Sequence, residues 1–330
     1  MTEVRILGSA EVRQLLSMTD CIEVIDKVLR TTARRRLMNP LRTVLALPGE
    51  TPGFLGYMPG WLADPAVFGA KLISVFPGNH GRGLSSHQGV VVIFEIETGQ
   101  PVAILDASAV TAIRTAAASA VATRALARRD ASVLAVLGYG EQAREHVAAM
   151  AAVRPVRRVV IWGRSAEKAR DFAKAHAALA PEARFEVAES VAEAVAGADL
   201  ICTTTAAKQP ILKGEWVKPG CHVNAVGASQ PNVAEVDGTL VARSRYYVDF
   251  IPSAEAEAAQ YRNALAAGLI GQDHILGEVG AVLDGEVPGR QSDDDITFFE
   301  SLGFAAEDLA TAHFVFERAA TQNVGVTVRF

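Results

Sequence analysis

The sequence is poor in aromatic residues and in cysteine. Of its 330 residues 6% are aromatic, and the three cysteines, Cys21, Cys202 and Cys221, lie far apart without a CxxC pair. Cys202 and Cys221 fall in apolar, strand-like runs, which is typical of small buried core residues. The seven histidines do not cluster at the spacing of metal ligands. We therefore expect a protein without a metal centre.

Long apolar runs and blocks of positive charge are also missing. No run is long enough to cross a membrane, and Lys and Arg are interspersed with acids at a net charge of −5, which argues against a nucleic-acid surface. The N-terminal residues lack the basic and apolar regions of a signal peptide. We expect a cytoplasmic protein that binds neither membranes nor nucleic acids. Half of the residues are hydrophobic, so the chain can bury the cores of two domains.

The most informative feature that is present is a glycine-rich turn after an apolar run, in residues 131–143. Gly138 allows a tight turn, Gly140 lets the backbone approach a pyrophosphate, and Ala143 keeps the following helix close to the sheet. The N-terminus of that helix offers free N–H groups to phosphates. The glycine pattern alone is a weak signal, but a second strand-like run at residues 158–163 strengthens it. The segment predicts a dinucleotide-binding βαβ unit.

The residues after the second run indicate which dinucleotide binds. An acid at this corner accepts a hydrogen bond from a ribose 2′-hydroxyl and repels a 2′-phosphate, but here Arg164 and Ser165 follow Gly163. A guanidinium suits a phosphate because it forms paired, charge-assisted hydrogen bonds. We predict NADPH, with NADH as the less favoured cofactor. The alternative is that Arg164 is solvated and Ser165 only caps the next helix.

The remaining sequence divides into two patterns. The first part reads as a helix followed by strands and a long Ala-rich helix, an α+β pattern. From residue 131 strands and helices alternate, which favours a doubly wound parallel sheet. The expected helices are 9–38, 107–128, 142–152, 166–179, 190–196 and 305–321, and the expected strands are 42–47, 53–62, 68–76, 89–95, 101–105, 131–137, 158–163, 185–187, 200–205, 222–226 and 246–250.

Nine segments in order resemble the ornithine cyclodeaminase/μ-crystallin family. They are 42–44, 56–59, 69–72, 85–89, 111–117, 138–143, 214–220, 224–229 and 297–303, and together they cover nearly the whole chain. The resemblance implies a fold of class α/β, with a Rossmann sheet at residues 116–307. It also implies an α+β substrate-binding and dimerisation domain formed from both chain ends, residues 1–115 with 308–330. It further implies a homodimer acting on small α-amino or α-imino acids.

Three cations stand in apolar surroundings where such a substrate needs them. A carboxylate is best held by a bidentate Arg and a supplementary Lys, and Arg42, Lys71 and Arg114 each lie inside one of the nine segments. The resemblance places all three near the substrate carboxylate or the reacting carbon. Without the resemblance, other interpretations are open. Arg42 could be solvated, and Lys71 could point outward to solvent. Arg114 could extend its guanidinium to the surface or pair with an acid such as Asp106. Lys71 is the predicted proton donor, because apolar groups and two Arg lower its pKa.

Ser229 separates two branches of the family. Relatives that cyclise ornithine carry an Asp after the Val-Gly-x segment, whereas this sequence has Ser229, and a hydroxyl is a poor general base near neutral pH. The segment looks like that of μ-crystallins, which reduce cyclic ketimines. The prediction is therefore a reductase of a cyclic α-imino acid, such as Δ1-pyrroline-2-carboxylate or Δ1-piperideine-2-carboxylate, giving proline or pipecolate.

The complete predicted site combines these residues. Lys71, Arg114 and Ser229 are the catalytic candidates, and Met58 and Ser86 join Arg42, Lys71 and Arg114 around the substrate. His87 beside Ser86 reads as a proton donor or, preferably, as a core histidine. The predicted cofactor residues are Gly138, Tyr139, Gly140, Glu141, Gln142, Arg164, Ser165, Thr205, Val226, Ser301 and Leu302.

Three other functions remain open. One is an alanine-dehydrogenase-like enzyme that uses an open-chain 2-oxo acid and ammonia. The second is a cyclodeaminase that recycles bound NAD within each turnover and releases ammonia. The third is a non-catalytic protein that binds NADPH or a small ligand, as μ-crystallins sometimes do. Retention of three site cations argues against the third.

Overall fold

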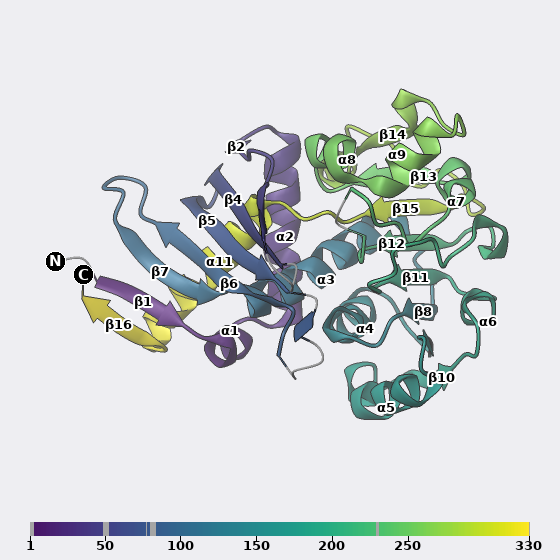
Figure 1. The fold of residues 1–330 in the computed structure, drawn as a ribbon, viewed down its shortest axis with the longest axis horizontal. Helices are drawn as coiled ribbons and strands as arrows, with labels where there is room; N and C mark the ends of the chain where they lie inside the picture. The colour runs from purple at the N-terminus through teal and green to yellow at the C-terminus, as the bar shows by residue number, and fades with distance from the viewer. Residues whose placement is uncertain (1–2, 49–52, 77, 80–83, 229–230, 330) are drawn as a thin grey trace. The chain divides into compact units, whose positions relative to one another are not determined.

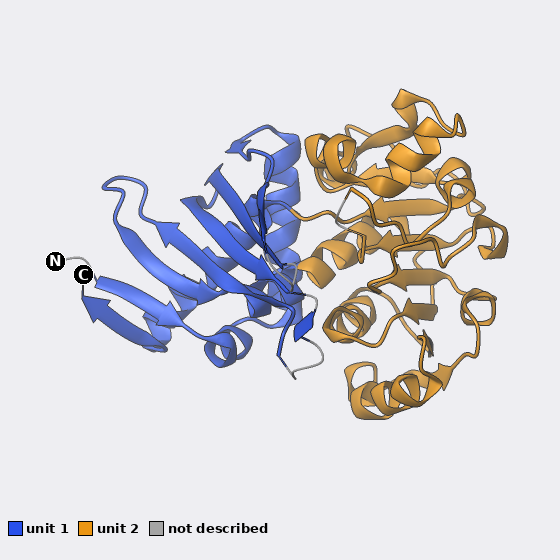
Figure 2. Ribbon diagram, in the orientation of Figure 1, with its two compact units in different colours: residues 1–114, 304–330 blue, residues 115–303 orange. Residues whose placement is uncertain are grey.

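The chain forms two compact units in the computed structural model, which describes residues 3–48, 53–76, 78–79, 84–228 and 231–329. Unit 1 consists of residues 1–114 and 304–330, and unit 2 of residues 115–303 (Figure 2). The second division precedes helix α11 (Ala305–Gln322), whereas the sequence placed it at residue 308, within the first turn of that helix. The reason is that α11 packs as one piece against strands of unit 1.

Unit 2 is built on one parallel sheet of eight strands (Figure 1), in the order β10-β9-β8-β11-β12-β15-β13-β14. The strands are β8 (Val133–Leu137), β9 (Arg158–Trp162), β10 (Arg184–Val187), β11 (Leu200–Thr203), β12 (His222–Ala225), β13 (Arg245–Val248), β14 (Ile275–Glu278) and β15 (Thr297–Glu300). The chain moves outward from β8 to β10 and then returns to β11 on the other side of β8. This reversal creates the crevice at which doubly wound sheets bind nucleotides. The predicted Rossmann sheet is confirmed.

Short helices connect these strands, and polar side chains start several of them. Ser165, Ser190 and Asp237 each accept a hydrogen bond from a first-turn N–H group of the helix that follows. The helices are α4 (Glu141–Val153), α5 (Ala166–His176), α6 (Val191–Val195), α7 (Gly238–Arg243), α8 (Ile251–Glu257), α9 (Ala259–Ala266) and α10 (Val279–Leu283).

Unit 1 is built on a mixed sheet in the order β16-β1-β7-β6-β5-β4-β2, with β3 also paired to β4. The β1–β7 pair is parallel and the other pairs are antiparallel. The strands are β1 (Glu3–Leu7), β2 (Leu37–Met38), β3 (Thr43–Leu47), β4 (Gly53–Ala63), β5 (Ala66–Val75), β6 (His87–Phe94), β7 (Pro101–Asp106) and β16 (Val326–Arg329). The first and last strands pair with each other, so both chain ends build this unit.

One helix predicted for residues 9–38 is two helices, α1 (Ser9–Leu15) and α2 (Met18–Ala33). The break occurs because the Ser17 hydroxyl accepts a hydrogen bond from the Asp20 N–H group and starts a new helix. The Ala-rich helix α3 (Ala107–Leu126) continues from unit 1 into unit 2. Among the described residues no helix is long and apolar enough to cross a membrane.

The unit 1 sheet has one covered face. Helix α11 lies against β4 and β5. A Cβ on Gly69 would lie 2.1 Å from the Val92 carbonyl oxygen of β6 and 3.1 Å from Leu309 Cδ2 of α11, so glycine permits both close approaches. The opposite face carries apolar side chains that are at least one third exposed. They pair across β3, β4 and β5 as Leu45 with Leu55 and Tyr57 with Leu72.

Candidate functional site

Lys71 lies on the covered face of the unit 1 sheet, in β5. Its side chain is 3% exposed, so it does not point outward to solvent. The Lys71 Nζ atom lies 2.6 Å from Asp308 Oδ2 and 3.4 Å from the Thr111 hydroxyl. A cation in this apolar setting therefore has an anionic partner, as the cost of burying a charge requires.

Arg114 reaches the same acid from helix α3. Its Nε donates to Asp308 Oδ1 at 2.9 Å and its Nη1 donates to Glu307 Oε2 at 2.7 Å, and both acids are fully buried in the first turn of α11. Asp106 is not its partner: that carboxylate accepts a hydrogen bond from the Ala109 N–H group at 2.7 Å, at the start of α3. Two cations and two carboxylates thus form one cluster, which we call the acid-binding cluster: Lys71, Arg114, Glu307 and Asp308.

The cluster tunes the charge of Lys71. Burial lowers the pKa of Lys71 to about 8; the Asp308 carboxylate opposes this shift, and the charges of Arg114 and Arg42 add to it. Burial alone would raise the pKa of Asp308, but the neighbouring Arg114 and Lys71 more than offset it, so the Asp308 pKa is lowered. Lys71 is therefore mostly protonated at neutral pH, yet close enough to neutrality to release a proton. The predicted direction of the Lys71 shift is confirmed.

The other predicted substrate residues differ in how they lie. Arg42 is half-buried, directly before β3, and close enough for its charge to act on Lys71. Met58 is 5% exposed and is the strand partner of Lys71. Ser86 places its hydroxyl 2.9 Å from Nδ1 of His87, and His87 is exposed. The interpretation of His87 as a core histidine is therefore wrong.

The turn between β8 and α4 has the geometry that a pyrophosphate requires. Gly138 has a φ of +129°, and a Cβ there would lie 2.6 Å from the Thr204 hydroxyl, so only glycine fits. Gly140 caps α4, and a Cβ on Gly140 would meet nothing within 4 Å, which leaves its surroundings open to a ligand. The first backbone N–H groups of α4 come directly after Gly140, and such groups bind phosphates. These residues fit a dinucleotide.

Two other predicted cofactor residues carry polar atoms that the described chain does not satisfy. The Gln142 Oε1 atom and the Ser301 hydroxyl are buried without a hydrogen-bond partner. Buried polar groups are nearly always paired, so an unpaired one suggests a missing ligand or water. Leu302 donates its N–H group to Asp249, and Glu141 is exposed in the first turn of α4.

The β9–α5 corner holds the predicted phosphate residues. Ser165 accepts a hydrogen bond from the Lys168 N–H group at 3.3 Å, so it does cap α5, while Arg164 is exposed. The half-buried Tyr139 ring lies over Gly163, where a Cβ would come within 2.2 Å of it. Gly163 is thus a position that the sequence analysis missed, although it directly follows an apolar strand.

Glu235 is a second residue that was missed. Its buried carboxylate accepts hydrogen bonds at 2.6–2.7 Å from the Thr203 hydroxyl, from the N–H group and hydroxyl of Thr205, and from the Gly227 N–H group. It therefore ties together the segments that follow β11 and β12, next to the predicted residue Val226. The available signal was an acid within the apolar stretch 233–236. Ser229, the residue that separates the two family branches, lies outside the described residues.

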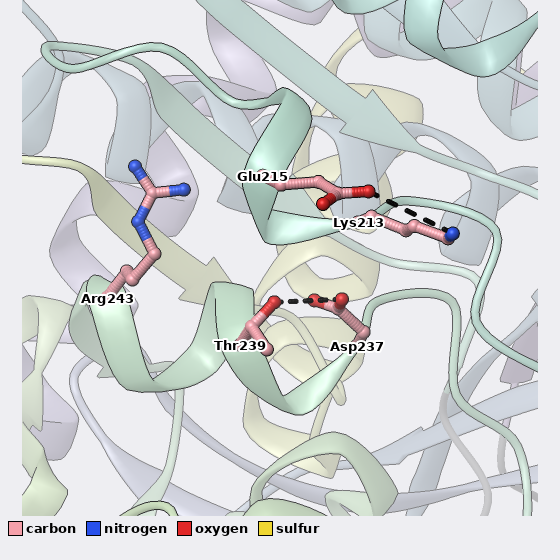
Figure 3. A pocket seen from close by; sticks show the side chains of 5 residues that line it. All are labelled: Lys213, Glu215, Asp237, Thr239 and Arg243. Carbon is pink, nitrogen blue, oxygen red and sulfur yellow. Dashed lines mark hydrogen bonds and ion pairs between the residues drawn. The ribbon is translucent and has the colours of Figure 1, made fainter.

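A pocket of about 410 Å³ lies elsewhere in unit 2, lined by Lys213, Glu215, Asp237, Thr239 and Arg243 (Figure 3). Four of these side chains pair with one another: the Thr239 hydroxyl donates to Asp237 at 2.8 Å, and Lys213 lies 3.9 Å from Glu215. Arg243 donates to the Gly214 carbonyl. None of these five residues belongs to the predicted site.

The chain is similar to known proteins over nearly its whole length. The sequence model of the ornithine cyclodeaminase/mu-crystallin family matches residues 2–323. The chain is 33% identical over 326 residues to a Δ1-pyrroline-2-carboxylate reductase of Bacillus cereus, covering 98% of this chain and 99% of that protein. It is 38% identical over 281 residues to the ketimine reductase mu-crystallin of Mus musculus, covering 85% of each.

A solved structure has the same fold. The Δ1-pyrroline-2-carboxylate reductase of Thermococcus litoralis, in complex with NADH and L-proline, superposes with a TM-score of 0.95 at 30% identity, covering 98% of this chain and 100% of that one. The structural similarity and the family match over nearly all of the sequence lead to the same classification. The chain belongs to the ornithine cyclodeaminase/mu-crystallin family.

Proposed function

We propose that the protein is an NADPH-dependent imine reductase. Its substrate is a cyclic α-imino acid, such as Δ1-pyrroline-2-carboxylate or Δ1-piperideine-2-carboxylate, and its product is a cyclic amino acid, such as proline or pipecolate. The observation that carries the proposal is the acid-binding cluster, in which two buried cations are held by buried acids. Relatives of this chain reduce Δ1-pyrroline-2-carboxylate or ketimines, as their names state.

The cations of unit 1 would hold the substrate carboxylate. Arg114 and Arg42 supply guanidinium groups that bind a carboxylate by charge-assisted hydrogen bonds, and Lys71 adds an ammonium. Glu307 and Asp308 fix the guanidinium of Arg114 before the substrate arrives, which lowers the entropy cost of binding. Met58 would contribute apolar contact beside Lys71.

Lys71 is the proposed proton donor to the imine nitrogen. An imine becomes a good hydride acceptor only when its nitrogen is protonated or strongly hydrogen-bonded, and a pKa of about 8 makes Lys71 a suitable acid near neutral pH. The bound reduced nicotinamide would supply the hydride. Gly138, Gly140, Gln142 and Ser301 are the proposed contacts to that cofactor, with Tyr139, Glu141, Thr205, Val226 and Leu302 around them.

The proposed cofactor preference is for NADPH over NADH. Arg164 is exposed at the β9–α5 corner, and no acid stands beside it in residues 162–165. A guanidinium at this place would pair with a 2′-phosphate, while Ser165 holds the start of α5.

The first test follows absorbance at the reduced-nicotinamide band with a panel of cyclic imino acids. We expect net oxidation of NADPH with one mole of amino acid formed per mole of cofactor. Ornithine should release no ammonia. Ammonia without net cofactor oxidation would make the protein a cyclodeaminase, and tight NADPH binding without turnover of any imino or oxo acid would make it a binding protein. Oxidation that requires pyruvate and ammonia would identify an alanine-dehydrogenase-like enzyme.

We also infer that the protein is a homodimer joined through unit 1. The apolar side chains Leu45, Leu55, Tyr57 and Leu72 are exposed together on one sheet face, and such a patch is typical of a protein interface. Sedimentation should give the mass of two chains, and Leu45→Glu should shift it toward one chain. Leu276→Glu, at an exposed leucine of unit 2, is the matched control and should stay dimeric. A monomeric wild-type protein would refute the inference.

A further inference from the structure

Both acids of the acid-binding cluster pair with Arg114, and Asp308 also pairs with Lys71. Both oxygens of Asp308 are committed to different cations, Oδ2 to Lys71 at 2.6 Å and Oδ1 to Arg114 at 2.9 Å. Glu307 Oε2 lies 2.7 Å from Nη1 of Arg114. A single carboxylate on α11 thus connects a strand residue and a residue of α3, which fixes the direction of both cationic groups.

This arrangement is a poor way to stabilise a fold. All four side chains are at most 5% exposed, and a buried ion pair is often no more stabilising than apolar residues of the same volume. A need for charged groups in fixed places explains the cluster better. Burial and fixed orientation are the conditions under which such groups act on a bound substrate.

The groups around Lys71 have opposite effects on its protonation. Asp308 faces it from α11, Arg114 and Thr111 from α3, Arg42 from the residue before β3, and the uncharged Met58 from β4. Burial and the two guanidinium charges favour neutral Lys71, and Asp308 favours its charged form. Asp308 is therefore the carboxylate beside Lys71 that opposes the loss of its proton.

We propose that Asp308 is a positioning residue that keeps Lys71 protonated and aimed at the imine nitrogen. This inference rests on the proposed function. An N–H bond of the Lys71 ammonium breaks, and its proton forms the N–H bond of the product amine. The electron pair stays on Nζ, a hydride completes the new C–H bond, and the reduced nicotinamide is oxidised. Lys71 then regains a proton from water. Asp308 stays ionised throughout.

The test is Asp308→Asn, which keeps the side-chain shape and removes the charge. We expect the alkaline limb of the kcat/KM profile to move to lower pH by roughly one to three pH units, the usual effect of one close charge. The loss should therefore be at least about fivefold at pH 8 and much smaller at pH 6. The substrate's own titration is the same for both proteins, so it does not move the limb. A merely structural role for Asp308 would lower activity equally at every pH, and that result would overturn the inference.

Glu307→Gln is the matched control. It removes a charge one residue away that pairs with Arg114, so it should change the KM for the imino acid without moving the alkaline limb. An equal limb shift in both variants would remove the special role of Asp308. If the Asn variant does not fold, Asp308→Glu decides: it should keep the wild-type limb with a lower kcat. An unchanged kcat in Asp308→Glu would argue against a role of Asp308 in positioning the Lys71 ammonium.

A second readout does not depend on turnover. The chain has seven lysines, so the ε-carbon resonance of Lys71 can be assigned by its loss in Lys71→Arg. Its titration midpoint should lie near pH 8 in the wild type and lower in Asp308→Asn. If this shift occurs but no imino acid is reduced, the proposed function fails and the coupling of the two residues stands. Suppose instead that imino acids are reduced, but Asp308→Asn changes neither the titration midpoint of Lys71 nor the alkaline limb of kcat/KM. The role of Asp308 is then refuted while the proposed function stands.

Discussion

Arg114→Ala is expected to lower kcat/KM for the cyclic imino acid at least about a hundredfold. The substrate carboxylate loses its planar partner, and a small misplacement of the reacting carbon alone costs about this factor. Arg114 also pairs with Glu307 and with one of the two carboxylate oxygens of Asp308. Its removal therefore leaves buried negative charge unpaired, which should lower the free energy of unfolding by roughly 3–5 kcal/mol. Steady-state kinetics and a thermal melt of the same sample separate the two effects.

Arg154→Ala is the matched control for this variant. Arg154 is 9% exposed, and its partners within the described part of the chain are backbone carbonyls, among them those of Thr123, Ala127 and Arg128. Its removal should lower the melting temperature without raising the KM for the imino acid. A near-wild-type rate in folded Arg114→Ala would show that Arg114 is not part of the site. Arg114→Lys keeps the positive charge but loses the planar guanidinium, so its kcat/KM should lie between those of the wild type and Arg114→Ala.

Arg164→Ala should abolish the preference for NADPH. A charge-assisted hydrogen bond is worth about 1.5–3 kcal/mol, so the KM for NADPH should rise roughly 10- to 150-fold while the KM for NADH stays nearly constant. The measurement is the Michaelis constant for each cofactor in wild type and variant. Arg157→Ala, at an exposed arginine paired with Glu182, is the control and should change neither constant. A clear NADH preference in the wild type would refute the assignment.

The sequence predicted the sheet of unit 2 well because its strands are buried on both faces and read as short apolar runs. It missed β1, β2 and β16 of unit 1, which are short. It also missed β14 and β15 of the unit 2 sheet, each of which has four residues that include a buried acid. The merged prediction for α1 and α2 failed for a local reason. Apolar periodicity continues through the break, and only the hydroxyl of Ser17 separates the two helices.

The acid-binding cluster was only half predictable. Lys71 and Arg114 could be found because a cation within an apolar run needs a partner. Their partners could not be found in this way, since Glu307 and Asp308 are nearly 200 residues from Arg114 and in a helix read only for its apolar face. A signal was available: two adjacent acids open a helix whose next residues are Leu and Ala. Acids favour a helix N-terminus in any case, which hides the second role.

The most direct test of the account uses NADPH deuterated at both C4 positions and unlabelled Δ1-pyrroline-2-carboxylate. We expect proline with one deuterium at its α-carbon for each NADPH oxidised. When only the buffer is deuterated, the α-carbon should carry no deuterium. Proline without deuterium at the α-carbon, or no proline while the cofactor stays reduced, would contradict it.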